Sequence, residues 1–179
     1  GDTARLGGGA RLLKNCALME VLGSVDETSS ALGMTRALAK DRILKQALLG
    51  VQQHLYRLMS HLSAIPEARE RYPGLATQDL EWLEDLIAEV GKGVPAVRDF
   101  VFPGDSIAGA ACHIARSTAR RAERRLVGLV ELDPDIGVAN LAYLNRLSSL
   151  MFVAALREDM LAGVNDSQRS RSKRGDSVK

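Results

Sequence analysis

Apolar residues recur every three or four positions through five long segments of the chain, and this spacing predicts five α-helices. The predicted helices cover residues 17–40, 41–64, 77–90, 105–131 and 138–161. Asp41 stands where a helix N-cap is expected, and Pro66, Pro73 and Gly74 separate the second helix from the third. No segment has the strict alternation of a β-strand. The predicted fold class is therefore all-α, a five-helix bundle.

Composition divides the 179 residues into two parts. Residues 1–163 contain all of the helical segments and suit a single bundle domain with one core. Residues 164–179 are polar and carry a net charge of +3, so we expect a disordered basic tail. The whole chain carries +2, which leaves −1 on the bundle. This near-neutral balance argues against a nucleic-acid partner.

The sequence also favours a location inside the cell. No apolar run approaches the length of a membrane span, and no signal peptide is visible, so we expect no membrane partner. Cys16 and Cys112 stand among apolar residues, as small core residues do in a reducing compartment. We expect a cytoplasmic protein, or a mitochondrial matrix protein in a eukaryote. Because the chain begins with Gly1 rather than methionine, we expect further residues upstream.

The fourth predicted helix carries an unusual cluster of positive charge in the segment ARSTARRAERR, residues 115–125. Its five arginines are Arg116, Arg120, Arg121, Arg124 and Arg125. Helical spacing places Arg116, Arg120 and Glu123 on the shoulder of a stripe of small residues, whereas Arg121 and Arg125 point away. Like charges at this spacing repel, so an anion is expected to compensate them. Either the face is solvated and Glu123 bridges Arg120, or the guanidinium groups bind an oligophosphate.

Three features elsewhere are candidates for the same site. The glycines at 7–9 would let backbone amides approach a phosphate with Lys14 as a point charge, or would simply be flexible. Asp26 lies beside apolar positions of the first helix, where Arg116 is an available partner. Asn145 lies within an apolar face of the last helix, which suits either a hydrogen-bonding role or packing.

The loop before the arginine helix and the histidines complete the candidate chemistry. Phe100 and Phe102 are close together in this loop and are candidates to line a pocket rather than the core. His54 and His61 are seven residues apart, but no Glu-x-x-His pair and no cysteine pair with zinc spacing accompanies them. We therefore expect no protein-held metal, and no Ser–His–Asp arrangement is indicated.

Five segments, in this order and spacing, carry a resemblance to a known family. They are LGGGARLLK, GSVDETSSALG, FVFPG, ARSTARRAERR and YLNRLS. Over roughly residues 1–160 the chain resembles the ATP:cob(I)alamin adenosyltransferases of the propanediol-utilisation type. The resemblance implies a five-helix bundle that assembles as a homotrimer with active sites between subunits. It also implies transfer of the adenosyl group of ATP to the cobalt of cob(I)alamin with Mg²⁺ present, giving adenosylcobalamin and triphosphate.

The resemblance also assigns roles to individual residues. The implied catalytic residues are Asp26, Arg116, Arg120 and Phe100. Asp26 and Arg116 would pair across a subunit boundary. Phe100 would help to displace the lower ligand of the corrinoid. The residues implied to bind ATP are Thr3, Lys14, Arg120, Arg121, Glu123, Arg124 and Asn145. Cobalt(I) would supply the nucleophile, so no catalytic serine, cysteine or histidine is needed.

Two departures from the family pattern and two other functions remain open. Only GDTARLGGG corresponds to the family's N-terminal ATP loop, so this loop is incomplete or absent. Ser149 stands where the family commonly has an acid, which puts in doubt a charge pair for which Arg146 is the candidate partner. The chain could instead be a helical scaffold whose arginines only form salt bridges. It could also be a relative that binds nucleotide or corrinoid with little turnover.

Overall fold

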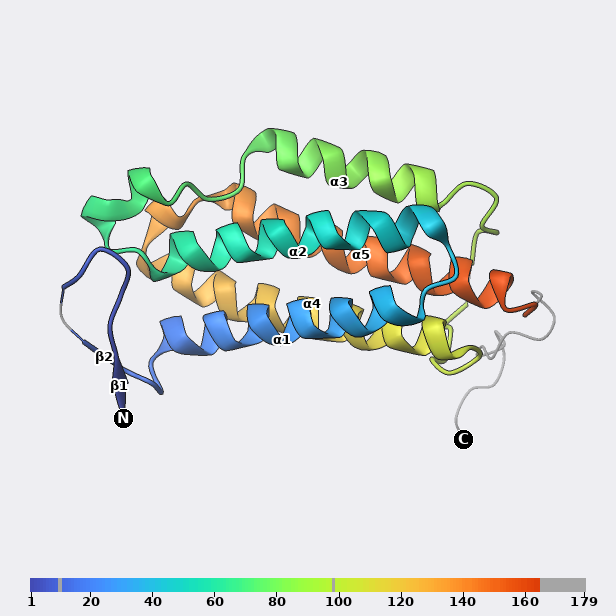
Figure 1. Ribbon diagram of the computed structural model, residues 1–179, viewed down its shortest axis with the longest axis horizontal. Coiled ribbons are helices and arrows are strands. Elements are labelled where there is room, and N and C mark those ends of the chain that lie inside the picture. The colour runs from blue at the N-terminus through green and yellow to red at the C-terminus, as the bar shows by residue number, and fades with distance from the viewer. Residues whose placement is uncertain (10, 98, 165–179) are drawn as a thin grey trace.

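The computed structural model describes residues 1–9, 11–97 and 99–164, which contain five long helices (Figure 1). These helices are α1 (Ala17–Leu38), α2 (Arg42–Ser63), α3 (Thr77–Val90), α4 (Ile107–Leu132) and α5 (Val138–Leu161). Each predicted helix is present with boundaries within two residues of the prediction, so the all-α bundle is confirmed. Asp41 is the N-cap of α2, as predicted, and its side chain accepts a hydrogen bond of 2.8 Å from Leu44 N. Of the predicted basic tail, residues 165–179 lie outside the described residues.

A short hairpin precedes the helices, and the sequence pattern missed it. Strand β1 (Asp2–Thr3) pairs antiparallel with β2 (Leu12–Leu13). Two-residue strands are too short to show an alternating pattern, which explains the error. Leu6, in the connection between them, donates its N–H to Ser63 O at 3.0 Å, and its carbonyl accepts from Ile65 N at 3.0 Å. These bonds attach the hairpin to the end of α2.

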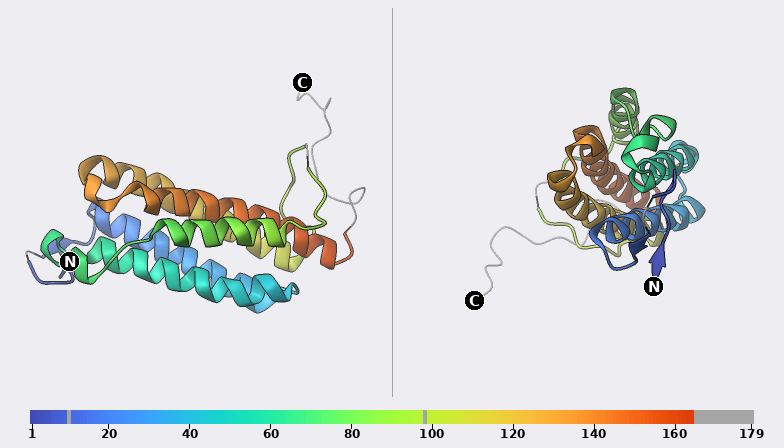
Figure 2. Two further views of the ribbon diagram at one scale, coloured as in Figure 1. Left: turned by 90° about the horizontal axis from the view of Figure 1, so that it is seen from above. Right: turned by 90° about the vertical axis from the view of Figure 1, so that its left-hand side faces the viewer.

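The helices lie side by side along one long axis. In the end-on view α1 packs between α2 and α4, while α5 packs against both α4 and α3 (Figure 2). Two 3₁₀ turns, Pro66–Arg71 and Pro134–Ile136, reverse the chain at the end that carries the hairpin. The loop from α3 to α4 lies at the opposite end. None of the described helices combines the length and the apolar character needed to cross a membrane.

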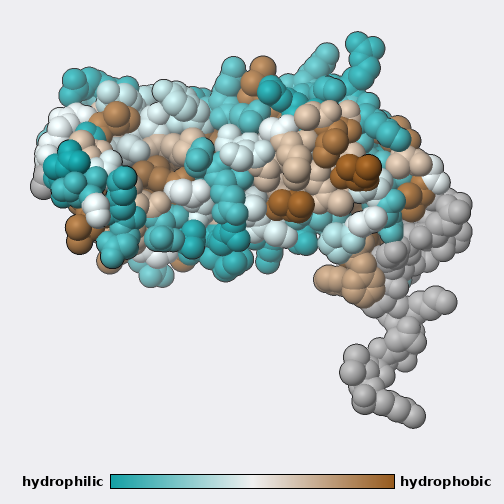
Figure 3. Space-filling model, turned by 60° about the horizontal axis from the view of Figure 1, so that its bottom comes forward, coloured by the Kyte–Doolittle hydropathy of each residue, from teal (hydrophilic) through white to brown (hydrophobic). Residues whose placement is uncertain are grey.

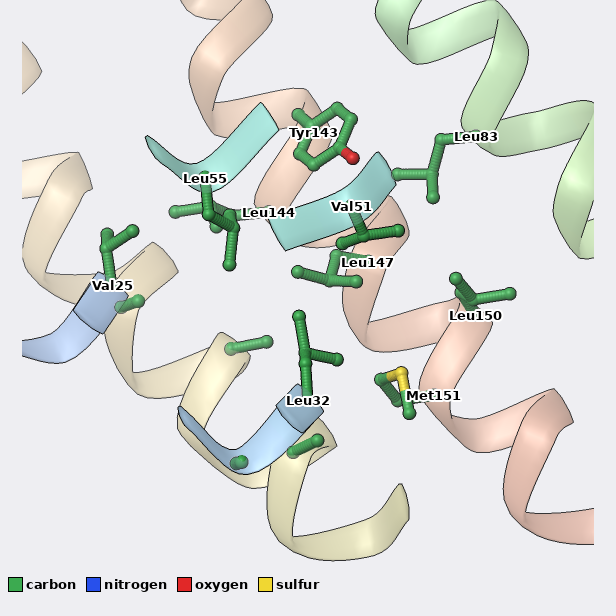
Figure 4. Close-up of a cluster of buried hydrophobic side chains, with 14 of the residues drawn as sticks. Val25, Leu32, Val51, Leu55, Leu83, Tyr143, Leu144, Leu147, Leu150 and Met151 are labelled. Atoms are coloured by element: carbon green, nitrogen blue, oxygen red, sulfur yellow. The ribbon is translucent and has the colours of Figure 1, made fainter. Parts of the chain in front are cut away.

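The core fills the space between these helices. Figure 4 shows Val25 and Leu32 from α1, and Val51 and Leu55 from α2, pointing toward Leu147 of α5 and its neighbours. The arginine helix contributes small side chains to this core, because Ala115, Ala119 and Ala122 are fully buried. Small residues let α4 pack closely against both α1 and α5. The residues of α4 on either side of this buried stripe therefore border two grooves, one between α4 and α1 and one between α4 and α5.

Three consecutive residues near the end of α5 hold the starts of two other helices. Glu158 is fully buried, and its two carboxylate oxygens each accept a backbone N–H at 2.9 Å, from Lys40 and from Asp41. Asp159 accepts a hydrogen bond of 2.6 Å from Ser106 Oγ, which caps the first turn of α4. Arg157 donates to Asp41 Oδ2 at 3.0 Å. The end of α5 therefore fixes where α2 and α4 begin.

Candidate active site

The arginines of α4 divide into two sets, as their helical spacing predicted. Arg121 and Arg125 reach toward α1, where they form ion pairs with Glu27 and Glu20 respectively. Arg116 and Arg120 instead lie on the side of α5. They line a pocket of about 290 Å³ whose other walls are Ser148, Ser149, Phe152 and Val153.

Positive charge in this Arg116–Arg120 pocket is not neutralised by any of the described residues. Across residues 1–9, 11–97 and 99–164, no carboxylate lies within ion-pair distance of either guanidinium group. Arg116 is half-buried, and this burial, reinforced by the charge of Arg120, lowers the pKa of Arg116. A lowered pKa means that the surroundings disfavour the cation until a negative charge arrives. The pocket is therefore suited to an anion that is bound by guanidinium forks and seryl hydroxyl groups.

Beside this pocket, Asn145 joins α5 to α4. Its Nδ2 donates a hydrogen bond of 2.8 Å to Glu123 Oε1, and both residues line a second hollow of about 340 Å³. Of the two alternatives for Glu123, the bridge to Arg120 is not formed, because Glu123 accepts from Asn145. The hydrogen-bonding role considered for Asn145 is confirmed, but the residue is exposed rather than placed in the apolar face. The reason is the helical turn, which carries Asn145 about 100° away from the buried Leu144.

Ser149 and Arg146 have different neighbours in the structure. Arg146 forms an ion pair with Glu84 of α3, with 3.3 Å between Nε and Oε1. Ser149 instead lines the Arg116–Arg120 pocket. Ser149 therefore adds no charge to the pocket wall, and Arg146 has an acidic partner in Glu84.

Asp26 and Arg116 do not meet within one chain. Asp26 is exposed on α1, one residue from the Glu27 that pairs with Arg121. Arg116 precedes Arg121 on α4 by more than one helical turn. It also faces α5, whereas Arg121 faces α1. The pairing of Asp26 with Arg116 across a subunit boundary stays a prediction.

Thr3 and Lys14 lie in the hairpin at one end of the bundle (Figure 1). Thr3 belongs to β1, and Lys14 is exposed directly after β2, where its N–H donates to Gly1 O at 3.1 Å. Neither residue lines the Arg116–Arg120 pocket. One chain therefore does not bring together all the residues that the resemblance assigns to ATP.

Phe100 and Phe102 are exposed and pack edge to face, with ring centroids 5.4 Å apart. They lie in the loop before α4, and Gly104 and Ser106, farther along the same loop, line a groove between α1 and α4. Exposed Met34, Leu38, Ile107 and Ile114 line this groove. Figure 3 brings this side of the molecule forward and shows apolar residues gathered on the half nearer the start of α4. The two phenylalanines are not part of the core, and neither lines the groove, so their pocket-lining role stays a prediction.

The histidines of α2 serve structure. His54 Nδ1 lies 2.9 Å from Tyr143 Oη, and its Nε2 lies 3.3 Å from the Asp79 carboxylate, which Arg57 also binds. Burial lowers the pKa of His54 despite the opposing effect of Asp79. His61 Nδ1 lies 2.9 Å from Tyr72 O. Within the described residues, no group of three or more His, Cys, Asp or Glu side chains is placed to hold a metal ion.

Three pocket residues and one neighbour of Arg116 were not singled out in the sequence as members of the site: Ser148, Phe152 and Val153, and His113. The first three line the pocket from α5, and His113 contacts Arg116 from the preceding turn of α4. Serine, phenylalanine and valine within an apolar helix have the same appearance as core residues. Only the position of α4 over α5 shows which of them face the arginines.

The fold and this cationic pocket define a class of protein, a helical bundle that presents unpaired arginines on one long helix. The sequence profile of the cobalamin adenosyltransferase family matches residues 1–158. The chain belongs to this family. It is 36% identical to a cobalamin adenosyltransferase of Cupriavidus metallidurans over 92% of this chain and 86% of that protein. It is also 35% identical to the corrinoid adenosyltransferase PduO of Citrobacter freundii, over 92% of this chain but only 49% of that protein.

Solved structures agree with this assignment. A phenylalanine-to-alanine variant of the PduO-type ATP:corrinoid adenosyltransferase from Lactobacillus reuteri, complexed with cobalamin and ATP, superposes with a TM-score of 0.84. That protein is 31% identical, and the match covers 97% of this chain and 94% of the other. An arginine-to-lysine variant of the same enzyme complexed with ATP gives a TM-score of 0.82 at 29% identity.

Proposed function

We propose that this protein transfers the 5′-adenosyl group of ATP to the cobalt of cob(I)alamin, forming adenosylcobalamin and triphosphate. The observation that carries the proposal is the pair Arg116 and Arg120, which line a pocket without a carboxylate partner among the described residues. Membership of the cobalamin adenosyltransferase family supports it. Structural relatives complexed with cobalamin and ATP support the same pair of substrates.

The reaction places modest chemical demands on the protein. Cobalt(I) donates an electron pair to the 5′ carbon of ATP, a cobalt–carbon bond forms, and the bond from this carbon to the triphosphate oxygen breaks. The leaving triphosphate takes the electron pair of the broken bond, so negative charge gathers on it. The protein has to hold the 5′ carbon in line with the cobalt and to stabilise the leaving group. Preorganised guanidinium groups suit the second task.

We assign the residues as follows. Arg120 binds the triphosphate, Asn145 and Glu123 orient the nucleotide from the adjoining hollow, and Arg124, exposed on the same helix, adds positive charge. Arg121 is already paired with Glu27, so we expect it to contribute less than Arg120. Mg²⁺ would be held by the phosphate oxygens of ATP and would neutralise part of their charge.

We propose a homotrimer with the site between subunits. The exposed apolar groove between α1 and α4 would be covered by a neighbouring subunit, and Lys14 and Thr3 of one subunit would reach the arginine pocket of another. The separation of the hairpin from the pocket within one chain supports this arrangement. A reducing compartment such as the cytoplasm is proposed as well, because Cys16 and Cys112 are free thiols.

Loss of the Asp26 carboxylate should weaken the trimer. In the proposed assembly Asp26→Ala leaves the half-buried Arg116 without its partner, which costs on the order of 3 kcal/mol per interface. Light scattering should report a lower mass than for the parent protein, with a parallel loss of activity. Glu20→Ala is the matched control, because Glu20 pairs with Arg125 of its own chain. An unchanged mass and unchanged activity for Asp26→Ala would contradict the pairing.

Truncation of Phe100 should affect turnover and not stability. Its side chain is 64% exposed, so Phe100→Ala should leave the melting temperature nearly unchanged. A buried phenylalanine would cost about 3–5 kcal/mol instead. We expect turnover to fall by about tenfold or more, since the ring would no longer position the corrinoid. Differential scanning calorimetry and an adenosylation assay measure the two effects, and a large drop in melting temperature would place Phe100 in the core.

An anaerobic assay tests the proposed function directly. The protein is mixed with ATP, Mg²⁺ and chemically reduced cobalamin, and the absorbance change to adenosylcobalamin is followed. A helical scaffold would fail to bind ATP in equilibrium titration, and a non-catalytic relative would bind ATP without turnover. Absence of conversion by the chain with its complete N-terminus would overturn the proposal.

A further inference from the structure

His113 contacts Arg116 in a way that the proposed reaction does not by itself require. His113 lies one turn before Arg116 on α4, and its side chain is buried, with 4% exposure for the residue. Arg116 Nε donates a hydrogen bond to His113 Nδ1 over 3.4 Å. From α5, Phe152 packs edge to face on the imidazole, with ring centroids 6.2 Å apart. The ring is therefore held between two helices, with one nitrogen directed to an arginine of the pocket.

This contact determines which nitrogen of His113 carries the proton. Arginine has only donors, so Nδ1 must present its lone pair and the proton of the neutral ring must be on Nε2. Nε2 is buried and has no hydrogen-bond partner among the described residues. Burial, together with the charge of Arg116, lowers the pKa of His113, while Asp105 opposes this effect. The neutral ring is thus the form present near neutral pH.

We propose that His113 is a positioning residue that orients the Arg116 guanidinium at the edge of the anion pocket, an inference that rests on the proposed function. The imidazole accepts from Nε and leaves the terminal amino groups of the guanidinium available for the pocket or for the partner subunit. Protonation of His113 would remove the acceptor and place two cations side by side. Since its pKa lies below the ordinary value, this change begins only as the pH falls below about 6.5.

The charged groups around His113 agree with a lowered pKa for this residue. Arg116 and Asp105 are the two whose charges act on its pKa, with opposite effects. Glu27 and Arg121 lie along the neighbouring groove, which His113 also lines, and neutralise each other as an ion pair. From α5 the ring faces Phe152, which has no charge. Arg116 is therefore the group that a protonated His113 would disturb most.

Three substitutions separate positioning from packing. His113→Asn places an amide oxygen near the position of Nδ1 and cannot titrate, so turnover near neutral pH should stay within about threefold of the parent. His113→Gln moves the acceptor to the Nε2 position, and His113→Phe retains the aromatic ring without an acceptor. Both should lower kcat by about tenfold, equivalent to about 1.4 kcal/mol, with melting temperatures close to that of His113→Asn.

The pH profile gives the readout that a structural role would not change. The parent protein should lose activity as the pH falls through the pKa of His113, and His113→Asn should lack this decline. Parent-like kcat in His113→Phe, or an unchanged acid decline in His113→Asn, would overturn the inference. The parent protein is assayed alongside as the reference. If the parent itself forms no adenosylcobalamin, the result contradicts the proposed function rather than the role of His113.

Nuclear magnetic resonance of ¹⁵N-labelled histidine tests the contact without any turnover. Long-range ¹H–¹⁵N spectra should show His113 as the neutral Nε2–H tautomer, with a pKa below about 6.5. Arg116→Ala should shift the Nδ1 signal of His113 and raise its pKa, while His54 and His61 serve as internal controls. If the parent protein forms adenosylcobalamin but Arg116→Ala leaves the His113 signals unchanged, the positioning role is wrong and the proposed function stands.

Discussion

Replacing Arg120 with lysine should weaken ATP binding or slow adenosyl transfer by about tenfold, corresponding to roughly 1.4 kcal/mol. Lysine keeps the positive charge but loses the planar fork that donates two parallel hydrogen bonds to a phosphate. Arg120→Ala should have a larger effect, about 100-fold or more, because the charge is lost as well. Calorimetric titration of ATP and assays at saturating ATP separate the effect on binding from the effect on chemistry.

Arg125 offers a matched control on the same helix. It is paired with Glu20 on the α1 side and does not line the Arg116–Arg120 pocket. Arg125→Lys should therefore change binding and turnover by less than about twofold, since exposed ion pairs contribute roughly 0–1 kcal/mol. Parent-like values for Arg120→Lys in both measurements would mean that the arginine cluster of α4 is only a charged surface exposed to solvent. Equal losses for the two substitutions would show a general effect of charge rather than a phosphate contact.

Removal of the Glu158 carboxylate should cost more stability than any other single change considered for this protein. Glu158→Ala leaves the buried N–H of Asp41 and the partly buried N–H of Lys40 without their acceptor, and it opens a cavity at the end of α5. Each unsatisfied buried N–H costs about 1–3 kcal/mol, so we expect a total of roughly 3–5 kcal/mol. For a chain of this length the melting temperature should fall by about 10 °C or more. Thermal unfolding followed by circular dichroism measures the change.

Two further substitutions test the physical reason. Glu158→Gln retains one acceptor oxygen and should cost about half as much as Glu158→Ala. Glu89→Ala is a surface control, because Glu89 forms only an exposed ion pair with Lys92. Its effect should stay within about 0.5 kcal/mol. A melting temperature for Glu158→Ala within two or three degrees of the parent would mean that the start of α2 is held by its own cap at Asp41.

The helices were predictable because their signal is local. An apolar side chain every three or four residues, a cap such as Asp41 and breakers such as Gly74 are all contained within one segment of sequence. The β1–β2 hairpin was missed because its strands are two residues each and depend on contacts with the end of α2. The site was predicted in part, since the angles of Arg116 and Arg120 on their helix follow from the same periodicity.

The sequence by itself determined five amphipathic helices, the cluster of arginines on one of them and the family to which the chain belongs. Only the tertiary structure decided which charges remain unpaired. Glu27 and Glu20 neutralise Arg121 and Arg125, while Ser149, where the family commonly has an acid, lies beside Arg116 and Arg120. Glu158 reaches a backbone N–H group 117 residues away. Such pairings depend on how far one helix slides and rotates against another, and packing of the whole core sets these two quantities.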